Sequence, residues 1–327
     1  MSTPSRLRAV ALLTAALVLT VAASATAHGD KKGDKAGDRT PSRLNVQLKG
    51  LKKGDLTVGK KIVAVGTMRP YVKGQKVTVI LSRGKKTAKR VVVPVRKKGG
   101  AGRFEFSKRL IKPGRYSVQA IHKKNATVGG SKDQSRRFHI HYPNLRKGNS
   151  GNTVKLFNTL LARLGYVNDE GGDYDEATGR AVLAFNKVNN DARSENADSA
   201  MFKKLAKGKG GYNIKEPGVS GKHVEADISR QIMVLAKGDK VDEIYSVSTG
   251  KSTTPTILGH FNFYRKEPGT NSHGMVNSVY FQGGYATHGY ASVPDYPASH
   301  GCIRSPIPDS LHIYNWIDIG DPIYVYR

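Results

Sequence analysis

The sequence predicts a multidomain chain that consists of a β-sandwich, a small α-helical domain and a mostly-β domain, in that order. Three observations support this prediction. Short apolar runs that alternate with polar residues recur between residues 43 and 142. Between residues 144 and 208, the apolar residues recur at helical spacing instead. Strand-like runs return between residues 222 and 327.

The first 42 residues are expected to lie outside these domains. Residues 1–27 carry Arg6 and Arg8, then an apolar run, then small residues up to Ala27, which is typical of a secretory signal peptide cleaved after Ala27. The apolar run is shorter than the ~20 residues of a membrane-spanning helix. We therefore expect no stable membrane anchor after cleavage; an anchor that stays is the alternative. Residues 28–42 are rich in Gly, Lys and Asp and predict a disordered basic linker.

About seven short strands are expected between residues 43 and 142, which is typical of a β-sandwich. Gly, Pro or Lys bounds each run, as in residues 77–81, 91–93, 104–106, 116–120 and 138–140. The segment Pro113-Gly114-Arg115-Tyr116, which enters one of these strands, resembles immunoglobulin-like modules of bacterial surface proteins.

The positive charge of the chain is concentrated in this N-terminal region. The whole chain has a net charge of +29, and residues 28–142 hold 31 Lys and Arg against 6 Asp and Glu. Residues 221–327, in contrast, have a net charge of −1. Such a basic surface predicts an anionic partner. The signal peptide and the lack of aromatic residues among the lysines argue against nucleic acid, so an extracellular polyanion is expected; a solvated spacer is the alternative.

Three helices are expected between residues 144 and 208. The first carries apolar residues from Val154 to Leu164 at helical spacing, with Ser150 or Asn152 as its N-cap. The second begins at about Asp175, and the third covers residues 199–205.

This helical segment resembles the three-helix peptidoglycan-binding repeat. The matching residues are 145–148, 164–166, 177–178 and 181–185. Asn158 and Asn186 stand where the repeat usually has Gln, and Asp175 stands where Gly is common. The resemblance implies binding to the cell wall; a helical spacer is the alternative.

A flexible linker at residues 209–221 is expected to precede the last domain. There, residues 232–236 and 244–247 predict a hairpin with a turn at residues 238–239. Residues 321–326 predict a closing strand.

Cys302, the only cysteine, is a candidate nucleophile in this last domain. His288 and His300 lie near it in the sequence, and each is followed by a glycine. A thiol with a pKa near ~8.5 is mostly protonated at neutral pH and needs a neighbouring base to attack a carbonyl carbon. One alternative is an inert, buried cysteine. Another is a zinc site formed by Cys302 and the two histidines, but no Cys-x-x-Cys or His-x-x-x-His spacing supports it.

The segment Ser299-His300-Gly301-Cys302-Ile303-Arg304, preceded by His288-Gly289, resembles the signature of the L,D-transpeptidases, the YkuD family of peptidoglycan cross-linking enzymes. Two upstream blocks agree with this resemblance, at residues 227–231 and 247–261, so it covers roughly residues 222–327. Two features depart from the common pattern. Only ten residues separate His288 from Ser299, as in the short-loop branch of the family, and Arg304 stands where many members carry Asn.

The resemblance implies a cysteine acyltransferase that needs no cofactor and no metal. Cys302 would be the nucleophile, and His288 would be the general base. His300 would line the site or serve as the alternative base, and the backbone of Gly301 would help to bind the oxyanion. The residues expected to contact substrate are Arg304, Ser299 and Gly289. For Arg304, a structural ion pair is the alternative to carboxylate binding.

The implied reaction forms 3→3 cross-links between peptidoglycan stem peptides through a thioester on Cys302. The protein would be secreted and associated with the cell wall, with roles in wall synthesis and cell shape. Its partners would be peptidoglycan and anionic wall polymers. One alternative is an L,D-carboxypeptidase that uses water as the acceptor. The other is a wall-anchored binding protein whose catalytic domain is inactive.

Overall fold

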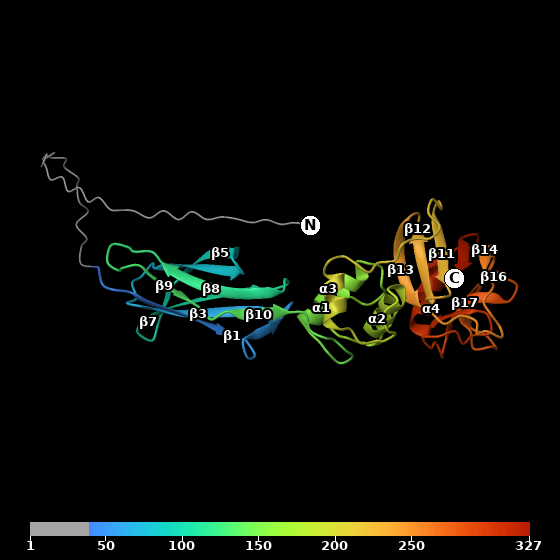
Figure 1. Cartoon of the computed structure of the whole chain (residues 1–327), viewed down its shortest axis with the longest axis horizontal. Coiled ribbons are helices and arrows are strands. Elements are labelled where there is room, and N and C mark those ends of the chain that lie inside the picture. The colour runs from blue at the N-terminus through green and yellow to red at the C-terminus, as the bar shows by residue number, and fades with distance from the viewer. Residues whose placement is uncertain (1–38) are drawn as a thin grey trace, which may run out of the picture. The chain divides into compact units, whose positions relative to one another are not determined.

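The computed structural model describes residues 39–327 (Figure 1). The predicted signal peptide at residues 1–27 and residues 28–38 of the predicted linker lie outside the described residues. Within residues 39–327, no helix is both long enough and apolar enough to span a membrane.

The N-terminal region consists of ten strands in two sheets (Figure 1). The strands are β1 (Arg43–Lys49), β2 (Asp55–Thr57), β3 (Lys61–Arg69), β4 (Lys76–Arg83), β5 (Lys86–Pro94), β6 (Arg96–Lys98), β7 (Ala101–Arg109), β8 (Gly114–His122), β9 (Ser131–Gln134) and β10 (Phe138–His141). One sheet has the order β1-β3-β7-β6. The other has the order β2-β10-β8-β4-β5, with β9 paired to β8.

The alternation of side chains along β3 explains how these sheets form a core. Ile62, Ala64 and Met68 are buried, whereas Val63 and Val65 on the opposite face are partly exposed. Successive side chains of a strand point to opposite faces, so one row from each sheet enters a shared apolar cluster. The predicted β-rich N-terminal region is thereby confirmed, while its immunoglobulin-like character stays a prediction.

Backbone pairing with the rest of the sandwich begins before Arg43, the first residue of β1. Thr40 forms a bridge with Val128, and the Ser42 hydroxyl donates a hydrogen bond of 2.7 Å to the Gly129 carbonyl oxygen. The prediction of a disordered linker up to residue 42 is therefore wrong for residues 40–42, because contacts with the loop after β8 hold them in place.

Three helices follow the sandwich: α1 (Asn152–Ala162), α2 (Glu176–Val188) and α3 (Ser199–Leu205). The Asp175 side chain caps α2 by accepting a hydrogen bond of 2.8 Å from the Thr178 amide. The N-cap of α1 is Gly151, and no side chain caps this helix. The predicted capping of α1 by Ser150 or Asn152 is therefore wrong. The wall-binding character of the three helices stays a prediction.

The C-terminal domain contains two further sheets and one helix (Figure 1). Its elements are β11 (Lys222–Asp227), β12 (Ile232–Lys237), β13 (Lys240–Ser246), β14 (Gly259–Asn262), β15 (Arg265–Thr270), β16 (Val276–Gln282), β17 (Tyr285–Tyr290), β18 (Ile303–Pro306), α4 (Ile307–Trp316) and β19 (Pro322–Tyr326). One sheet has the order β13-β12-β11-β19-β14, and the other has the order β15-β16-β17-β18. Side chains from both sheets, such as Leu235 and Phe281, share one apolar cluster. The domain is mostly β, as the sequence predicts.

The segment at residues 209–221 is not the flexible linker that the sequence predicts. Tyr212 is buried, and its hydroxyl donates a hydrogen bond of 2.7 Å to Glu225 on β11. The amides of Lys215 and Glu216 donate to the same carboxylate at 2.9 and 2.8 Å. A buried carboxylate needs such donors, and these bonds tie the segment to the sheet.

The helical segment also packs directly against the C-terminal domain. The Ile244 amide on β13 donates a hydrogen bond of 2.7 Å to the Gly165 carbonyl oxygen. Tyr166 and Phe185 belong to the same apolar cluster as Ile232 and Ile244. The three helices and the sheet face formed by β12 and β13 therefore share a core.

Candidate active site

Cys302 lies at the end of a tight turn that leads into β18. Gly301 precedes it with a φ of +119°, a conformation that favours glycine. A Cβ atom at Gly301 would also lie 2.7 Å from the Tyr285 ring, so a larger residue does not fit there. The Cys302 Sγ atom lies 3.5 Å from the Gly284 carbonyl oxygen. The turn thus places the thiol beside the start of β17.

The Cys302 thiol is neutral at rest. Burial raises its pKa, because the surrounding protein disfavours the thiolate. A hydrogen bond from the Ala286 backbone and the charge of Arg304 lower the pKa, but by less than burial raises it. Since the thiolate is the nucleophile, Cys302 needs a base to remove its proton.

His288 on β17 has the properties of such a base. Its ring is buried, and Nδ1 lies 2.9 Å from the Gly289 carbonyl oxygen. A carbonyl oxygen can only accept a hydrogen bond, so Nδ1 carries the proton and Nε2 has a free lone pair in the neutral ring. Burial is also the main reason that the pKa of His288 is lowered. The imidazole is therefore neutral and able to accept a proton at Nε2.

His288 and Cys302 line the same pocket, which has a volume of about 420 Å³. The other residues around it are His273, Met275, Gly284, Tyr290, Ser299, His300 and Arg304. Strand pairing explains this convergence. β17 and β18 are parallel neighbours, with His288 opposite Arg304, so the residue just before β18 lies close to the strand that carries His288.

Ser299 holds the turn that carries the nucleophile. Its buried hydroxyl donates a hydrogen bond of 2.6 Å to the Cys302 carbonyl oxygen and accepts one of 3.0 Å from the Gly301 amide. The Gly301 amide was expected to be an oxyanion donor. That expectation needs correction for this conformation, because the amide already donates to Ser299.

His300 lies at the outer edge of the pocket. Its side chain is exposed, and its Nε2 atom lies 3.5 Å from the Lys251 ammonium group. The arrangement is that of a residue in the wall of the site, which favours His288 as the base.

Arg304 is one of the residues that line the pocket. Its guanidinium group stacks on the Tyr290 ring at 4.1 Å from the ring centroid, and Nη1 lies 3.4 Å from the Ala298 carbonyl oxygen. No ion pair of Arg304 with an acidic side chain is found within residues 39–327. The structural ion pair that was the alternative for Arg304 is therefore wrong, and the cation remains available to an anionic group.

Gly289 is not among the residues that line the pocket, so its contact with substrate stays a prediction. It packs against α4, where a Cβ atom would lie 2.6 Å from the Cβ atom of Ser310. Only glycine allows this approach, and its carbonyl oxygen accepts the His288 hydrogen bond. Gly289 acts by orienting the base.

Some residues of the site were missed by the sequence analysis. His273 and Met275, from the turn between β15 and β16, line the pocket but lie far from the cysteine motif in the sequence. Thr256 supports the turn, because its hydroxyl donates a hydrogen bond of 2.8 Å to the Gly301 carbonyl oxygen. The same hydroxyl accepts one of 2.9 Å from the Gly250 amide. The resemblance of residues 247–256 to a family block was the only sequence signal for this support.

A zinc site was the alternative role for Cys302, His288 and His300. Within the part of the chain that the structure describes, no group of three or more His, Cys, Asp or Glu side chains is arranged to hold a metal ion.

Comparisons with known proteins agree with this geometry. Residues 221–325 match the family model of the L,D-transpeptidase catalytic domain, YkuD. The chain is similar to a crystal structure of an L,D-transpeptidase from Xylanimonas cellulosilytica DSM 15894, with 30% identity and a TM-score of 0.51 over 56% of this chain and 98% of that chain. It is also similar to an L,D-transpeptidase from Stackebrandtia nassauensis, with 22% identity and a TM-score of 0.36 over 56% of this chain and 95% of that chain. None of the curated proteins matches the sequence. The family match and the similarity to the Xylanimonas enzyme show that the chain belongs to the L,D-transpeptidase (YkuD) family.

Proposed function

We propose that the protein is a cysteine L,D-transpeptidase that forms 3→3 cross-links between peptidoglycan stem peptides. The observation that carries the proposal is the pairing of Cys302 with His288 in one pocket, with the His288 Nδ1 proton engaged by the Gly289 carbonyl oxygen. This pairing supplies a nucleophile and a base with a free lone pair, which acyl transfer requires.

In the first half-reaction, His288 Nε2 takes the thiol proton while Cys302 Sγ attacks the carbonyl carbon of the third stem residue. The tetrahedral intermediate then collapses, the bond to the terminal D-alanine breaks, and His288 returns the proton to the departing amine. A thioester on Cys302 remains. The Cys302 amide donates none of the hydrogen bonds found in residues 39–327, so it is our candidate oxyanion donor in place of the Gly301 amide.

In the second half-reaction, a side-chain amine of a neighbouring stem attacks the thioester. The amine loses a proton to His288, a new amide bond forms, and the carbon–sulfur bond breaks. Cys302 then regains its proton. Arg304 is our candidate to bind a carboxylate of either stem, because it lines the pocket and has no acidic partner among the described residues.

Mass spectrometry of muropeptides tests this proposal. The purified protein is incubated with tetrapeptide-containing peptidoglycan fragments, and the products are separated. Cross-linked dimers with release of D-alanine support a transpeptidase. Tripeptides without dimers would indicate a carboxypeptidase that uses water, and unchanged fragments would indicate a binding protein with an inactive domain.

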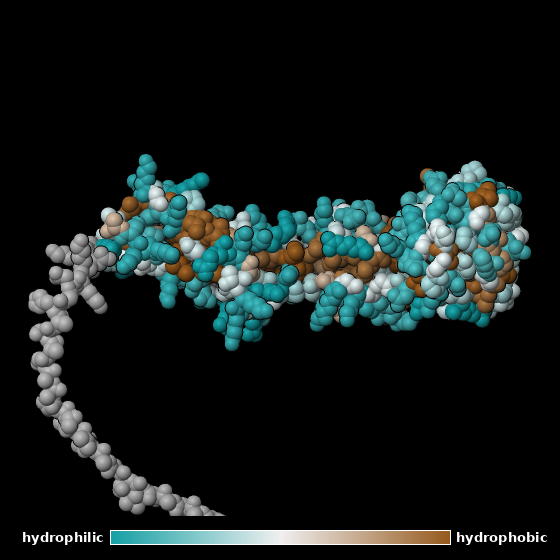
Figure 2. Space-filling model, turned by 90° about the horizontal axis from the view of Figure 1, so that it is seen from above, coloured by the Kyte–Doolittle hydropathy of each residue, from teal (hydrophilic) through white to brown (hydrophobic). Residues whose placement is uncertain are grey.

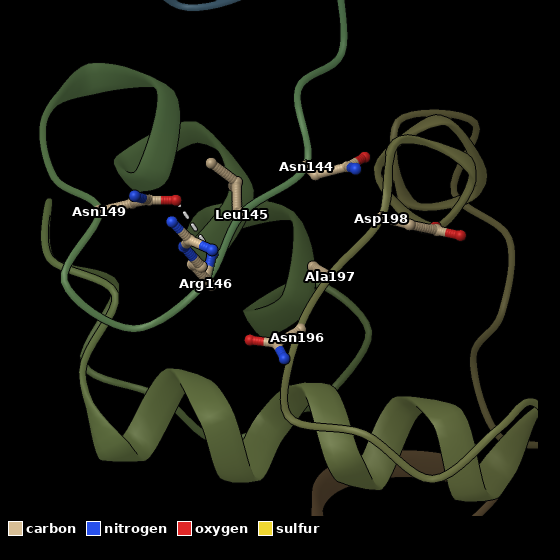
Figure 3. Close-up of a pocket in the computed structure, with 7 residues that line it drawn as sticks. All are labelled: Asn144, Leu145, Arg146, Asn149, Asn196, Ala197 and Asp198. Atoms are coloured by element: carbon tan, nitrogen blue, oxygen red, sulfur yellow. Dashed lines mark hydrogen bonds between the residues drawn. The ribbon is translucent and has the colours of Figure 1, made fainter.

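We also propose that the helical segment binds the peptidoglycan wall. A pocket of about 490 Å³ lies between the residues that enter α1 and those that enter α3 (Figure 3). Leu145 and Ala197 pair through their backbones there, and Asn149 accepts a hydrogen bond of 3.0 Å from the Arg146 amide. The polar side chains around the pocket suit the hydroxyl and amide groups of a glycan strand. Equal retention of Arg146→Ala and the unaltered protein on polymer-stripped sacculi would contradict this role of the pocket.

A third proposal concerns the sandwich, which we expect to hold a secreted enzyme at the wall by its positive charge. A groove of about 670 Å³ on the sandwich is lined by five cations and a single carboxylate, Glu105. The cations are Lys49, Arg96, Lys97, Lys98 and Arg103. Figure 2 shows that hydrophilic side chains cover much of the sandwich, at the left of that view, with apolar atoms exposed between them. Phosphate- or carboxylate-bearing wall polymers fit such a surface.

Retention on intact cell walls across a salt series tests the tether. Exposed charges are screened over ~8–10 Å at 0.1–0.15 M salt, so retention should fall between low and physiological salt. Paired charge reversal, Arg96→Glu with Lys98→Glu, should weaken it, whereas Lys203→Glu with Lys207→Glu on the helical segment should not. Retention that is indifferent to salt, or to removal of the anionic polymers, would contradict the tether.

A further inference from the structure

Lys187 is a buried lysine at the junction between α2 and the C-terminal domain. Its side chain is only 3% exposed. The Nζ atom lies 3.2 Å from the Gln231 carbonyl oxygen, 2.8 Å from the Ser246 hydroxyl oxygen and 3.1 Å from the Val247 carbonyl oxygen. None of the ion pairs within residues 39–327 includes Lys187. Because burying an unpaired charge destabilises a fold, stability alone does not explain this residue.

The three contacts match the charged form of the side chain. An ammonium group has three N–H donors and no acceptor, and three acceptors surround Lys187. A neutral amine has two N–H donors and one lone pair, so after deprotonation it would donate only to the two carbonyl oxygens and accept from the Ser246 hydroxyl. The ammonium form donates to all three groups, and its charge strengthens these hydrogen bonds.

Hydrogen bonds, joined by the covalent chain within single residues, connect Lys187 to the turn that carries the nucleophile. The Gln231 side chain accepts a hydrogen bond of 2.8 Å from the Thr249 amide and donates one of 2.6 Å to the Thr249 hydroxyl. The Thr249 carbonyl oxygen accepts hydrogen bonds of 2.9 Å from the amides of Ala298 and Ser299. The Ser299 hydroxyl in turn donates to the Cys302 carbonyl oxygen. Each hydrogen bond joins neighbouring residues, and the covalent structure of Gln231, Thr249 and Ser299 connects one bond to the next.

The helical segment makes two further ties to the same region. The Arg193 guanidinium group donates a hydrogen bond to the Asp295 carbonyl oxygen, in the loop between His288 and Cys302. Arg180 on α2 donates to both carboxylate oxygens of Asp309 on α4, at 3.0 and 2.8 Å. The loop before Cys302 and the helix α4 that follows β18 are therefore each tied to the helical segment.

We propose that Lys187 is a positioning residue for catalysis: its ammonium group, acting through Gln231 and residues 247–249, holds the turn at residues 298–302 in the geometry that the reaction needs. The helical segment is then part of the catalytic unit, in addition to any role in wall binding. The inference rests on the proposed transpeptidase function for its effect on turnover, but its effect on the loop does not depend on the substrate.

The positioning contact depends on pH near neutrality. Burial is the main reason that the pKa of Lys187 falls to about 7. The charge of Arg193 lowers the pKa further, and Asp295 raises it, while the contacting groups of Gln231, Ser246 and Val247 are uncharged. The ammonium form is therefore lost as the pH rises through about 7. The loop should be held more tightly below this pH than above it.

The pH dependence of stability has the opposite direction to that of the loop contact. An unfolded lysine keeps its proton up to a pH of ~10.4, so between pH 7 and pH 10 the unfolded chain binds more protons than the folded chain. The contribution of Lys187 to the free energy of unfolding therefore rises with pH across this window. Replacement of Lys187 by an apolar residue should relieve the cost of the buried charge below pH 7 while it releases the loop.

Lys187→Met, with Lys203→Met on the exposed face of α3 as the matched control, tests the proposal in the full-length protein. Hydrogen exchange of a peptide that covers residues 296–304 is measured at pH 6 and pH 9 for each protein. At pH 6, the amides of Ala298 and Ser299 should exchange roughly 3- to 30-fold faster in Lys187→Met than in the unaltered protein. The ratio should approach one at pH 9, and Lys203→Met should show no change at either pH.

Turnover and melting temperature complete the test. At pH 6, kcat for a tetrapeptide substrate should fall by a factor similar to that of the exchange ratio, with KM nearly unchanged, and the melting temperature should not fall. Lys187→Arg, which keeps its charge at every accessible pH, should retain slow exchange at pH 9.

Unchanged exchange in Lys187→Met would overturn the proposal. A ratio of the Lys187→Met rate to the unaltered rate that is the same at pH 6 and pH 9 would also overturn it, because the effect of a purely structural contact would not depend on pH. If Lys187→Met does not fold, fast exchange at pH 9 in a folded Lys187→Arg would likewise overturn it. If the unaltered protein shows no turnover, the transpeptidase proposal fails, while the pH-dependent exchange ratio still decides the role of Lys187.

Discussion

The hydroxyl of Ser299 donates a hydrogen bond of 2.6 Å to the carbonyl oxygen of Cys302, three residues further along the chain. The same hydroxyl accepts a hydrogen bond from the Gly301 amide. One side chain thus closes both ends of the turn that presents the nucleophile, and its own backbone is anchored to Thr249. These contacts fix the turn that positions the thiol.

Ser299→Ala should therefore reduce both stability and turnover. The change leaves the Gly301 amide and the Cys302 carbonyl without their partner, which costs ~1–3 kcal/mol of unfolding free energy. The freed turn should lower kcat by up to roughly 100-fold, because small displacements of a reacting group are costly. Chemical denaturation and steady-state kinetics measure the two effects. Ser252→Ala, at an exposed position nearby, is the control; equal behaviour of the two variants would contradict the role of Ser299.

The two histidines of the site should differ sharply in their importance. His288→Ala removes the proposed base, so acylation should slow by ~10²–10⁴-fold. His300→Ala removes an exposed side chain at the edge of the pocket and should have a much smaller effect. Single-turnover kinetics of D-alanine release measures acylation directly. A larger loss for His300→Ala than for His288→Ala would reverse the assignment.

The acid limb of the pH profile should lie below the usual range for histidine. Since burial lowers the pKa of His288, the ring stays neutral to a lower pH than a free imidazole with a pKa of ~6.5. The value of kcat/KM should therefore decline only when the pH falls below ~6.5. A decline centred above this value would show that another group controls the reaction.

The thiol should show a shift in the opposite direction. Burial raises the pKa of Cys302, and only the thiolate reacts with alkylating agents. The rate of alkylation by iodoacetamide should therefore keep rising with pH beyond the ~8.5 of an ordinary cysteine. Cys302 is the only cysteine in the chain, so the labelling needs no other correction. A plateau at or below neutral pH would instead indicate a preformed thiolate.

Gly289→Ala should destabilise the C-terminal domain. The new methyl group would lie 2.6 Å from the Cβ atom of Ser310 on α4, so either the helix or the strand must move. Overpacking of this kind costs ~1–3 kcal/mol, and the movement should also disturb the His288 contact. Thermal unfolding measures the loss. Gly284→Ala is the control for stability, because a Cβ atom there meets nothing within 4 Å; equal melting temperatures would contradict the packing role.

Strong local patterns explain which parts of the fold could be predicted. The third helix was expected at residues 199–205 and is found as Ser199–Leu205, because Asp198 caps a short apolar repeat. α4 was missed because exposed Ile307 and Leu311 obscure the one-sided apolar pattern by which a helix is predicted. The segment at residues 209–221 has the composition of a linker, and only the fold brings Glu225 to its amides.

In the active site, too, local sequence patterns predict some features and only the fold reveals the others. The cysteine motif identifies Cys302, His288 and Ser299, because the reacting groups lie in one short stretch of sequence. Whether the Gly301 amide is free to bind an oxyanion depends on where the Ser299 hydroxyl points. No pattern of residues in the sequence predicts this orientation. The contacts of Lys187 join groups that are far apart in the sequence, so only the packed structure reveals them.

Intact-protein mass spectrometry tests the central claim, that Cys302 forms a covalent acyl-enzyme, most directly. The unaltered protein and Cys302→Ala are each mixed with a tetrapeptide-containing fragment and quenched in acid at short times. The unaltered protein should gain the mass of the fragment minus D-alanine, and the adduct should map to the peptide that contains Cys302. Cys302→Ala should fold normally and show neither adduct nor turnover. An adduct on Cys302→Ala, or turnover by that variant above a few per cent of the unaltered rate, would contradict the account.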